Sequence, residues 1–421
     1  MKILLLTQVV PYPPDSGPKI KTYNVIRYLA QHHEIHLVSF SRSESETSAA
    51  EALRPYCKEI TTIPLRRSSL KDAWFLGRSL ISGRPFLIER DDSSVMRTAV
   101  ETQLGRQSFD AVHADQLSMA QFAVGLPLAL RVLDEHNAVW TIVHRAAKAG
   151  GFGLRRMLAE IEWRKLQAYE ADICQRFDFT TVVSIDDFLA IAGPARAIFP
   201  ARVIPIAVDS QEMAFEPRSA EARHIVSVAT MFYPPNAEGV HWFACEVFPL
   251  IRQSIPNVQF YIIGARPPDK IVRLARTGNG VVVTGYLSDL APTLRKAAVM
   301  VVPVHSGSGM RVKILESFSR GIPVVSTTVG AEGIDARNGQ HLLVADSPSE
   351  IAEAVIRVLT DPLESTKLAS AGRELVEAQY DWRTALCGLD ELYPSSISGL
   401  PPVPTPADAD GPNTLVQAPP R

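Results

Sequence analysis

One stretch of the sequence joins a loop, the start of a helix and a buried strand: His305-Ser-Gly-Ser-Gly-Met-Arg-Val-Lys-Ile-Leu-Glu-Ser-Phe-Ser-Arg-Gly-Ile-Pro-Val-Val-Ser-Thr327. The helix that we expect to begin near Met310 turns its positive end towards the loop. Arg311 and Lys313 add two full positive charges at the same place. This combination is typical of an anion-binding site, and a diphosphate is the anion that suits so much charge.

The neighbouring residues extend the predicted site. Gly307, Ser308 and Gly309 are small and leave backbone amides accessible to an anion. Glu316 follows Lys313 by three residues on the same helix face, where a carboxylate can accept hydrogen bonds from a pair of ribose hydroxyls. The alternative is a solvated helix start in which Lys313 and Glu316 only pair with each other.

Around this stretch, apolar runs of strand length alternate with segments of helical period, which favours parallel sheets with crossover helices. Strands are predicted over residues 2–10, 34–40, 59–65, 109–114, 129–134 and 179–185. The pattern then restarts, with strands predicted over 225–229, 258–264, 280–285, 300–303 and 323–326. We therefore predict an α/β fold with two doubly wound, Rossmann-like domains that face a central cleft.

The chain length supports two domains, because 421 residues exceed what one hydrophobic core usually holds. We expect the joint where the apolar segment 203–208 gives way to a polar one. The predicted parts are an N-terminal domain over 1–200, a C-terminal domain over 201–380, a helix over 381–393 that packs back towards the N-terminal domain, and a disordered Pro-rich tail over 394–421.

Composition argues against several classes of protein. The formal net charge of -2 lacks the basic excess of a nucleic-acid binder. The four cysteines lie too far apart for a disulfide framework or a zinc site, so we predict a reducing compartment and no cysteine-bound zinc. The apolar N-terminal run is cut short by Gln8 and Pro11, so it is interpreted as a buried strand rather than a signal peptide, and no run reaches the length of a membrane span.

Three residues of the first half lie at predicted strand ends, the edge at which open parallel sheets bind ligands. Gly17 lies in the loop after the first strand, where its backbone can approach a phosphate. His113 and His136 lie near the ends of the fourth and fifth strands, where an imidazole can polarise a hydroxyl or steady a sugar. The alternatives are a simple turn at Gly17 and hydrogen-bonded histidines that only complete the strand ends.

Two further segments carry the same kind of signal. Val283-Thr-Gly-Tyr-Leu-Ser-Asp289 ends a predicted strand at Gly285, where backbone groups can hold the edge of a base. Asn236, in Pro234-Pro-Asn236, is expected to cap a helix.

With these residues in view, the sequence resembles the GT-B glycosyltransferases, specifically the retaining family four that uses nucleotide-sugar donors. The resemblance extends to about Tyr393. It is most specific over Gly309–Val325, which is similar to the family's K-x-x-E-A-x-A-x-G-x-P-V-V segment. Residues 232–243 resemble the start of the family's donor domain, and residues 283–289 resemble its base-side loop.

The resemblance implies a role for each candidate residue. Arg311 and Lys313 would hold the diphosphate, Glu316 would bind the ribose, and His113 would contact the transferred sugar and act in catalysis. Gly17 would lie beside the diphosphate, and we assign His136 to the acceptor. The family needs no metal and no cofactor, because basic side chains and a helix end neutralise the leaving group.

The sequence also departs from the family. The first glutamate of its Glu-x7-Glu motif falls at Ser308, so the carboxylate implied to touch the donor sugar is missing. The Arg and Lys usual after the first donor-domain strand are absent, since Met231 and Asn236 occupy that region. Pro18 removes an amide donor next to Gly17. These departures shift the expected phosphate contacts onto Arg311 and Lys313.

The function predicted from the sequence is transfer of a sugar from a nucleoside-diphosphate sugar to a hydroxyl acceptor with retention of anomeric configuration, in polysaccharide or glycolipid synthesis. Two alternatives remain: a sugar-nucleotide 2-epimerase on the same scaffold, and a catalytically silent relative that binds nucleotide.

The predicted partners are the donor and a hydroxyl acceptor that is lipid-linked in many relatives, with no nucleic acid. Residues 65–78 mix basic and aromatic residues, as in an interfacial helix or an ordinary amphipathic surface helix. We expect a cytoplasmic protein with peripheral contact at the inner face of the membrane.

Overall fold

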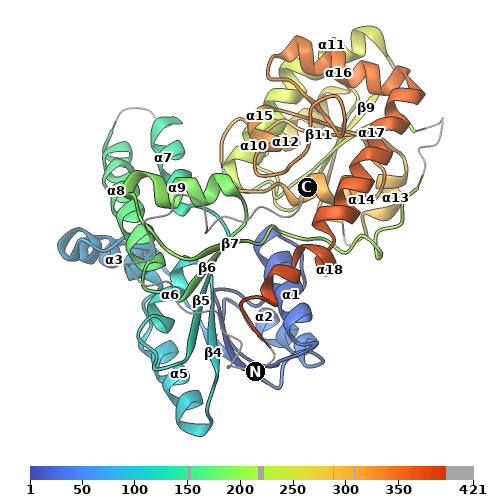
Figure 1. Ribbon diagram of the computed structural model, residues 1–421. Coiled ribbons are helices and arrows are strands. Elements are labelled where there is room, and N and C mark those ends of the chain that lie inside the picture. The colour runs from blue at the N-terminus through green and yellow to red at the C-terminus, as the bar shows by residue number, and fades with distance from the viewer. Residues whose placement is uncertain (150–152, 217–221, 288, 308, 395–421) are drawn as a thin grey trace. The chain divides into compact units, whose positions relative to one another are not determined.

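The computed structural model describes residues 1–149, 153–216, 222–287, 289–307 and 309–394, which form two compact units (Figure 1). The first unit contains Met1–Ile206 and the chain from Ala385 onward, and the second contains Ala207–Thr384. The tail predicted over 394–421 lies outside the described residues, except for its first residue.

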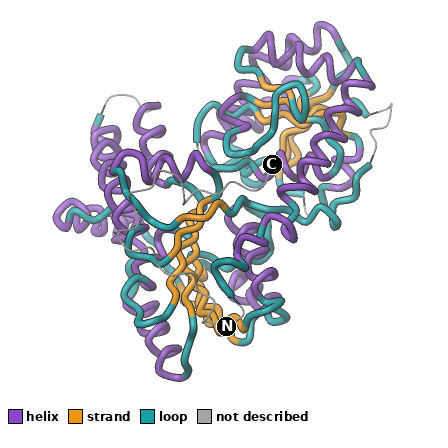
Figure 2. Tube along the Cα trace, viewed as in Figure 1, coloured by secondary structure: helices purple, strands orange, loops and turns teal. Residues whose placement is uncertain are grey.

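The first unit is built on a seven-stranded parallel sheet in the order β3-β2-β1-β4-β5-β6-β7 (Figure 2). The strand order reverses between β1 and β4, so the helices before the reversal and those after it lie on opposite faces of the sheet. Accordingly, α1 and α2 cover one face while α5 and α6 cover the other (Figure 1). The strands are β1 Lys2–Thr7, β2 Glu34–Ser41, β3 Glu59–Pro64, β4 Ala111–Asp115, β5 Leu130–Glu135, β6 Phe179–Val182 and β7 Ala201–Val203.

One or more helices connect each pair of successive strands in the first unit. They are α1 Gly17–Leu29, α2 Glu44–Ala49, α3 Ser69–Ser82, α4 Phe86–Asp91, α5 Ser94–Arg106, α6 Leu117–Ala123, α7 Val139–Ala149, α8 Leu154–Cys174 and α9 Ile185–Ala195. The core between sheet and helices includes Leu4, Phe40, Val112 and Leu133, all without exposed surface. Strands covered on both faces explain the nearly continuous apolar runs in the sequence.

The second unit repeats this plan with a six-stranded parallel sheet in the order β10-β9-β8-β11-β12-β13. Its strands are β8 His224–Val228, β9 Gln259–Ile263, β10 Val281–Gly285, β11 Ala297–Val302, β12 Val324–Ser326 and β13 Leu343–Val344. Its helices are α10 Pro234–Trp242, α11 Phe248–Ser254, α12 Asp269–Leu274, α13 Ala291–Arg295, α14 Val312–Ser319, α15 Thr328–Ala331, α16 Pro348–Thr360, α17 Pro362–Leu375 and α18 Trp382–Ala385. Phe243, Phe260 and Val299 lie at the centre of its core.

The α/β class and the parallel sheets are as predicted, but several details differ. The short edge strands β7 and β13 carry too few residues to form a periodic pattern. The strand predicted up to residue 185 ends at Val182, because the Ser184 side chain accepts a hydrogen bond from Asp187 N and starts α9. In place of one helix over 381–393, the structure has α18 and a 3-10 turn at Cys387–Leu389.

A helix that crosses a membrane must be long and predominantly apolar. Within the described residues, none of the helices combines the length and the apolar character that a membrane crossing demands.

Candidate functional site

The start of α14 is formed by a loop with unusual backbone angles. The loop follows β11, and two of its glycines have positive φ, 103° at Gly307 and 84° at Gly309. Since residues with a Cβ rarely adopt these angles, the turn depends on glycine. The predicted site residue Ser308 lies outside the described residues. Met310 is buried, and α14 begins two residues later than Met310, with Arg311 as its N-cap.

Two glycines let neighbouring segments approach this loop. A Cβ on Gly307 would lie 3.3 Å from both the Arg311 Nη2 atom and the Tyr233 hydroxyl oxygen. A Cβ on Gly239 of α10 would lie 2.0 Å from the Pro303 carbonyl oxygen, closer than any side chain allows. The loops after β8 and β11 therefore meet at the carboxyl edge of the sheet because both positions lack a side chain.

The two cations of the opening stretch lie together at this edge. The Arg311 Nη1 atom donates a hydrogen bond of 2.6 Å to the Gly309 carbonyl oxygen, which holds the guanidinium against the glycine loop. Burial and the nearby charge of Arg311 lower the pKa of Lys313 from 10.5 to about 7. Two like charges in a poorly hydrated place repel each other, and an anion between them would relieve that repulsion.

The polar neighbours of Lys313 come from two segments. Its Nζ atom lies 3.5 Å from Asn236 Oδ1, and Asn236 also donates to the Thr230 carbonyl oxygen. Asn236 is thus not the helix cap that we predicted: Tyr233 is the N-cap of α10, and Asn236 lies inside the helix. Burial raises the pKa of Glu316, one turn along α14, against the opposing charges of Arg320 and Lys313.

Other groups at the same edge come from β8, β9 and β10. Gly285 ends β10 with a φ of 72°, in the left-handed region. Arg266, after β9, places its guanidinium 3.9 Å from the centre of the Phe232 ring, and both Phe232 and Tyr286 are exposed. Neither Arg266 nor Phe232 was among the predicted site residues. They add a flat aromatic surface and a further cation to the edge that holds Lys313.

In the first unit the site residues enclose a buried ion pair. Lys21 of α1 pairs with Asp134 of β5, and neither side chain is more than 2% exposed. The Thr181 hydroxyl also donates to Asp134, at 2.5 Å. Burial alone would raise the pKa of Asp134, but the charge of Lys21, with help from His113 and His136, holds that pKa well below its ordinary value.

His113 differs from its predicted position at a strand end. It is the third of the five residues of β4 and has no exposed surface. Its Nδ1 atom lies 2.7 Å from the Tyr393 hydroxyl, which comes from the C-terminal segment, and its Nε2 atom lies 3.6 Å from Asp134 Oδ2. His113 therefore belongs to the network of buried polar side chains around Asp134. Its partner Tyr393 is too distant in the sequence to have been predicted.

His136 lies one residue beyond β5 and is almost completely buried. Its Nε2 atom lies 3.0 Å from Asp115 Oδ1 and 3.6 Å from Asp134 Oδ2. Although burial opposes its charged form, these two carboxylates raise the pKa of His136 above 6.5. Gly17, the remaining candidate of this unit, is the first residue of α1, which also carries Lys21.

The same cluster contains the donors of a metal site. His113, Asp115 and Asp134 each offer one ligand atom, and these atoms lie within 4.8 Å of one another. Imidazole and carboxylates are ligands that divalent cations accept. However, the ammonium of Lys21 already pairs with Asp134 and would repel a second cation. Metal independence thus stays a prediction.

A second group of carboxyls lies beside the network. Glu170 accepts hydrogen bonds from the Val139 and Trp140 amides at the start of α7, and burial raises its pKa to about 8. Burial and neighbouring Glu170 raise the pKa of Glu135 well above its ordinary value. Among the described residues, no donor reaches either oxygen of the Glu135 carboxyl. Burial and the neighbouring carboxyls therefore favour the protonated form of Glu135.

This protonation makes the stability of the protein depend on pH. Because the folded-state pKa of Glu135 is raised, the native protein keeps a proton that the unfolded chain releases above about pH 4.3, so stability falls as pH rises from there. We expect Glu135→Gln to melt at a higher temperature than the wild type at pH 8, where the wild type loses stability, and close to it at pH 4. Glu101→Gln, at an exposed position of α5, is the control and should change neither value. An unchanged melting temperature of Glu135→Gln at pH 8 would contradict the assignment.

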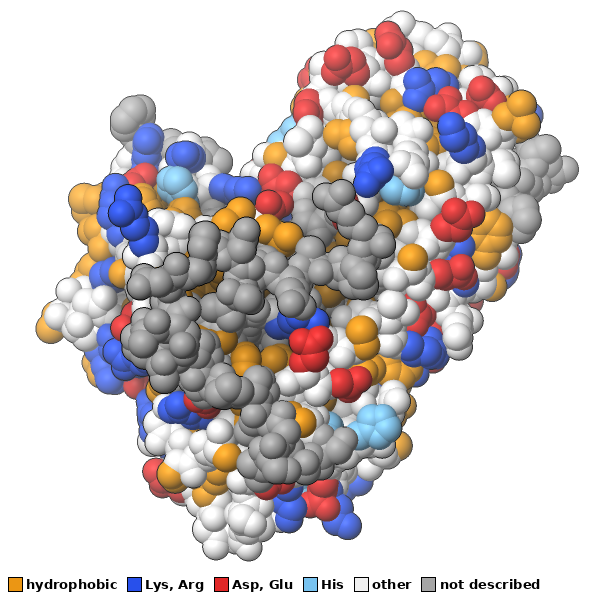
Figure 3. Space-filling model, viewed as in Figure 1, with side chains coloured by type: hydrophobic (Ala, Val, Ile, Leu, Met, Phe, Trp, Pro, Cys, Tyr) orange, Lys and Arg blue, Asp and Glu red, His pale blue; other side chains and the backbone are white. Residues whose placement is uncertain are grey.

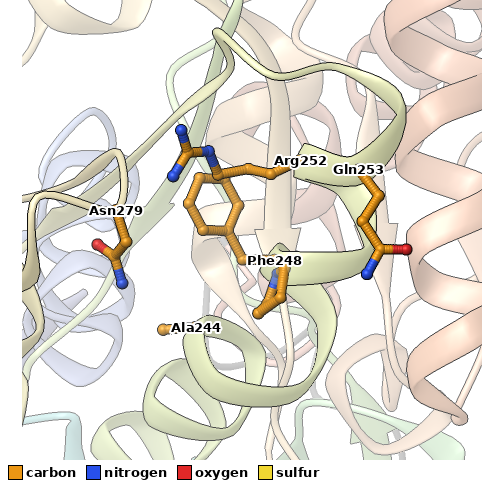
Figure 4. A pocket seen from close by; sticks show the side chains of 6 residues that line it. Ala244, Phe248, Arg252, Gln253 and Asn279 are labelled. Carbon is orange, nitrogen blue, oxygen red and sulfur yellow. The ribbon is translucent and has the colours of Figure 1, made fainter.

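A cavity of the second unit lies elsewhere. It measures about 300 Å³ and is lined by Phe248 and Arg252 together with Ala244, Pro249, Gln253 and Asn279 (Figure 4). Arg252 and Gln253 precede β9, and Asn279 precedes β10, so the cavity lies at the amino edge of the sheet. It is separate from the edge that holds Lys313.

Comparisons with known proteins bear on both units. Residues 222–361 match the family described as Glycosyl transferases group 1. A GDP-mannose-dependent alpha-(1-6)-phosphatidylinositol monomannoside mannosyltransferase of Mycobacterium tuberculosis is 25% identical over 303 residues, which cover 62% of this chain and 77% of the relative. A glycogen synthase of the same organism is 26% identical over 251 residues, which cover 56% of this chain and 58% of the relative. An uncharacterized 44.6 kDa protein from the cps region of Klebsiella pneumoniae is matched over 42% of its length, so this chain spans about half of these last two relatives.

Solved structures resemble nearly the whole chain. Sucrose-phosphate synthase of Thermosynechococcus elongatus aligns with a TM-score of 0.68 and 17% identity, covering 93% of this chain and 98% of that one. Anabaena HepE, solved with UDP and glucose, aligns with a TM-score of 0.66 and 14% identity, covering 94% and 100%. At such identities the likeness concerns the fold, and it confirms the predicted GT-B fold.

Proposed function

Since residues 222–361 are a glycosyl transferases group 1 domain, we propose that the protein transfers a sugar from a nucleoside-diphosphate donor to a hydroxyl acceptor with retention of anomeric configuration. The observation that carries this proposal is the pair of cations Arg311 and Lys313 at the start of α14, where burial has lowered the pKa of Lys313 to about 7. A desolvated ammonium beside a guanidinium is an arrangement suited to a dianionic group.

In the proposed reaction the bond between the anomeric carbon and the diphosphate oxygen breaks, and the diphosphate leaves with the electron pair. Arg311, Lys313 and the amides at the start of α14 stabilise the charge that develops on that oxygen. The acceptor hydroxyl bonds to the anomeric carbon on the face that the diphosphate leaves, and its proton passes to the leaving phosphate. Glu316 holds the ribose, and Gly285 lies beside the base.

We assign the acceptor to the first unit. His113 has no exposed surface, so we now give it a positioning role through Asp134, while His136 lies beyond the strand end and is the better candidate to touch a ligand. We propose a polysaccharide or glycolipid product made at the cytoplasmic face of a membrane. A lipid-linked acceptor is supported by the mannosyltransferase relative of Mycobacterium tuberculosis, which is named for a phosphatidylinositol monomannoside.

Retention and metal independence are tested together. With a nucleotide-sugar donor and its acceptor, NMR of the first product formed is expected to show the anomeric configuration of the donor. Chelation by EDTA is expected to leave turnover unchanged, because cationic side chains and a helix end neutralise the leaving group. A product of inverted configuration, or activity lost with EDTA and restored by a divalent cation, would contradict the proposal.

The same assay separates the competing functions. An epimerase converts a nucleotide sugar to its isomer without any acceptor, whereas the proposed transferase does not. A silent relative binds nucleotide and transfers nothing to any acceptor.

A further inference from the structure

We propose that the first unit docks on an anionic lipid bilayer through exposed apolar side chains of α3 and of the first half of α8. This surface, named here the α3–α8 surface, consists of Leu70, Trp74, Ile81, Leu154, Met157 and Ile161. The proposal goes beyond sugar transfer and does not depend on it.

The apolar residues of α3 lie on one face of the helix. Leu70, Trp74 and Ile81 are spaced by four and seven residues, so they form a row along the helix. Leu70 is 86% exposed and Ile81 is 91% exposed. Of the residues of α3, all of which are described, Ser79 alone is buried. A helix with so little of its surface covered leaves its apolar row free for another surface.

The apolar residues of α8 form a second row at the spacing of one helix face. Leu154, Met157 and Ile161 are 66%, 54% and 37% exposed. The next residue of this row is Lys165, whose Nζ atom donates a hydrogen bond of 2.7 Å to the Ser79 carbonyl oxygen of α3. The row on α8 therefore runs up to α3, and the two rows belong to one side of the first unit.

Charge distinguishes this side from the rest of the chain. Residues 65–83 and 139–165 together contain ten basic residues and three acidic ones, whereas the whole chain has a net charge of -2. The basic residues are Arg66, Arg67, Lys71, Arg78, Arg145, Lys148, Arg155, Arg156, Arg164 and Lys165, and the acidic ones are Asp72, Glu160 and Glu162. In Figure 3, Lys and Arg side chains alternate with hydrophobic ones over the region where Figure 1 labels α3, α7 and α8.

This chemistry fits a lipid headgroup layer better than a protein. Basic residues attract the negative surface of an anionic bilayer, and isolated Leu, Ile, Met and Trp side chains insert among the headgroups. Trp74 is an interfacial residue type, and Arg78 lies over its ring at 5.6 Å. A protein interface is usually poor in lysine at its centre and has a continuous apolar core, which this mixed surface lacks.

The test uses the full chain and vesicle flotation. Wild-type protein is expected to float with vesicles of phosphatidylcholine containing about one third phosphatidylglycerol at least about tenfold more than with phosphatidylcholine alone. The double variant Trp74→Glu/Met157→Glu is expected to lose this binding. The matched control is Leu363→Glu, because Leu363 is 84% exposed on α17 of the second unit, and it should float like the wild type.

Three results would overturn the proposal: no flotation of the wild type with anionic vesicles, equal flotation with neutral ones, or a double variant that floats normally. Far-UV circular dichroism and the melting temperature show whether the double variant folds, and if it does not, Leu70→Gln/Met157→Gln replaces it. If light scattering shows a wild-type dimer that the variant loses, and neither protein floats, the surface binds a second copy of the chain instead.

Discussion

Replacing Lys313 by alanine is expected to lower kcat/KM for sugar transfer by about 10²- to 10³-fold, as does loss of one donor to a developing negative charge in other enzymes. Lys313 lies at the start of α14 with its pKa lowered to about 7 by burial and by Arg311. The charged ammonium of Lys313 therefore has few stabilising interactions until an anion binds beside it. Lys296→Ala, at an exposed position before β11, is the matched control and should keep full activity.

The lowered pKa adds a pH dependence to the same experiment. The free protein carries a charged Lys313 only below about pH 7, so binding of a nucleoside diphosphate above that pH must include uptake of a proton. Its affinity is expected to fall as pH rises from 7 to 9, as calorimetry in buffers of different ionisation enthalpy would show. Lys313→Arg, which stays charged throughout, should bind with an affinity that no longer changes over this range. Wild-type activity in Lys313→Ala, or a pH-independent wild-type affinity, would argue against the site.

The variant Lys21→Ala removes the cation of the buried Lys21–Asp134 pair. It is expected to lower the free energy of unfolding by about 3–5 kcal/mol, because Asp134 would be left as an uncompensated buried charge. The comparison is Arg54→Ala, which breaks a pair whose side chains are 58% and 63% exposed and should leave the stability nearly unchanged. Urea unfolding followed by far-UV circular dichroism measures both.

Two additional measurements show whether charge is the cause. The double variant Lys21→Met/Asp134→Asn removes both charges and should recover part of the stability that Lys21→Ala loses. Since Lys21 holds the pKa of Asp134 well below its ordinary value, the stabilisation is present above the unfolded pKa of about 3.9 and is lost as pH falls through the lower folded pKa. An equal loss in the single and double variants would indicate that packing, not charge, is what Lys21 supplies.

The sequence predicted the pair of cations at the start of α14 better than the buried network of the first unit, and for a physical reason. Gly307, Arg311 and Lys313 lie within seven residues of one another, so local rules of turns and helix ends apply to them. Lys21 carried a weaker signal: it precedes the buried residue Val25 by four positions in α1 and so lies on the inward face.

Tyr393 could not be anticipated in the same way. Its hydroxyl meets His113 across 280 positions of the chain, and no periodicity relates two such distant residues. The strand predicted over 109–114 ends one residue later, because β4 continues to Asp115. That extension places the imidazole inside the sheet rather than at its edge.

The sequence by itself determined the α/β class, the two parallel sheets and the loop that gathers cations before α14, because periodicity, glycine and charge act over a few neighbouring residues. Only the tertiary structure decided which polar groups surround them: Asn236 beside Lys313, Lys21 beside Asp134, and Tyr393 beside His113. Burial changes the pKa of a group through its distance from water and from other charges, and those distances exist only once strands and helices from distant parts of the chain have packed together.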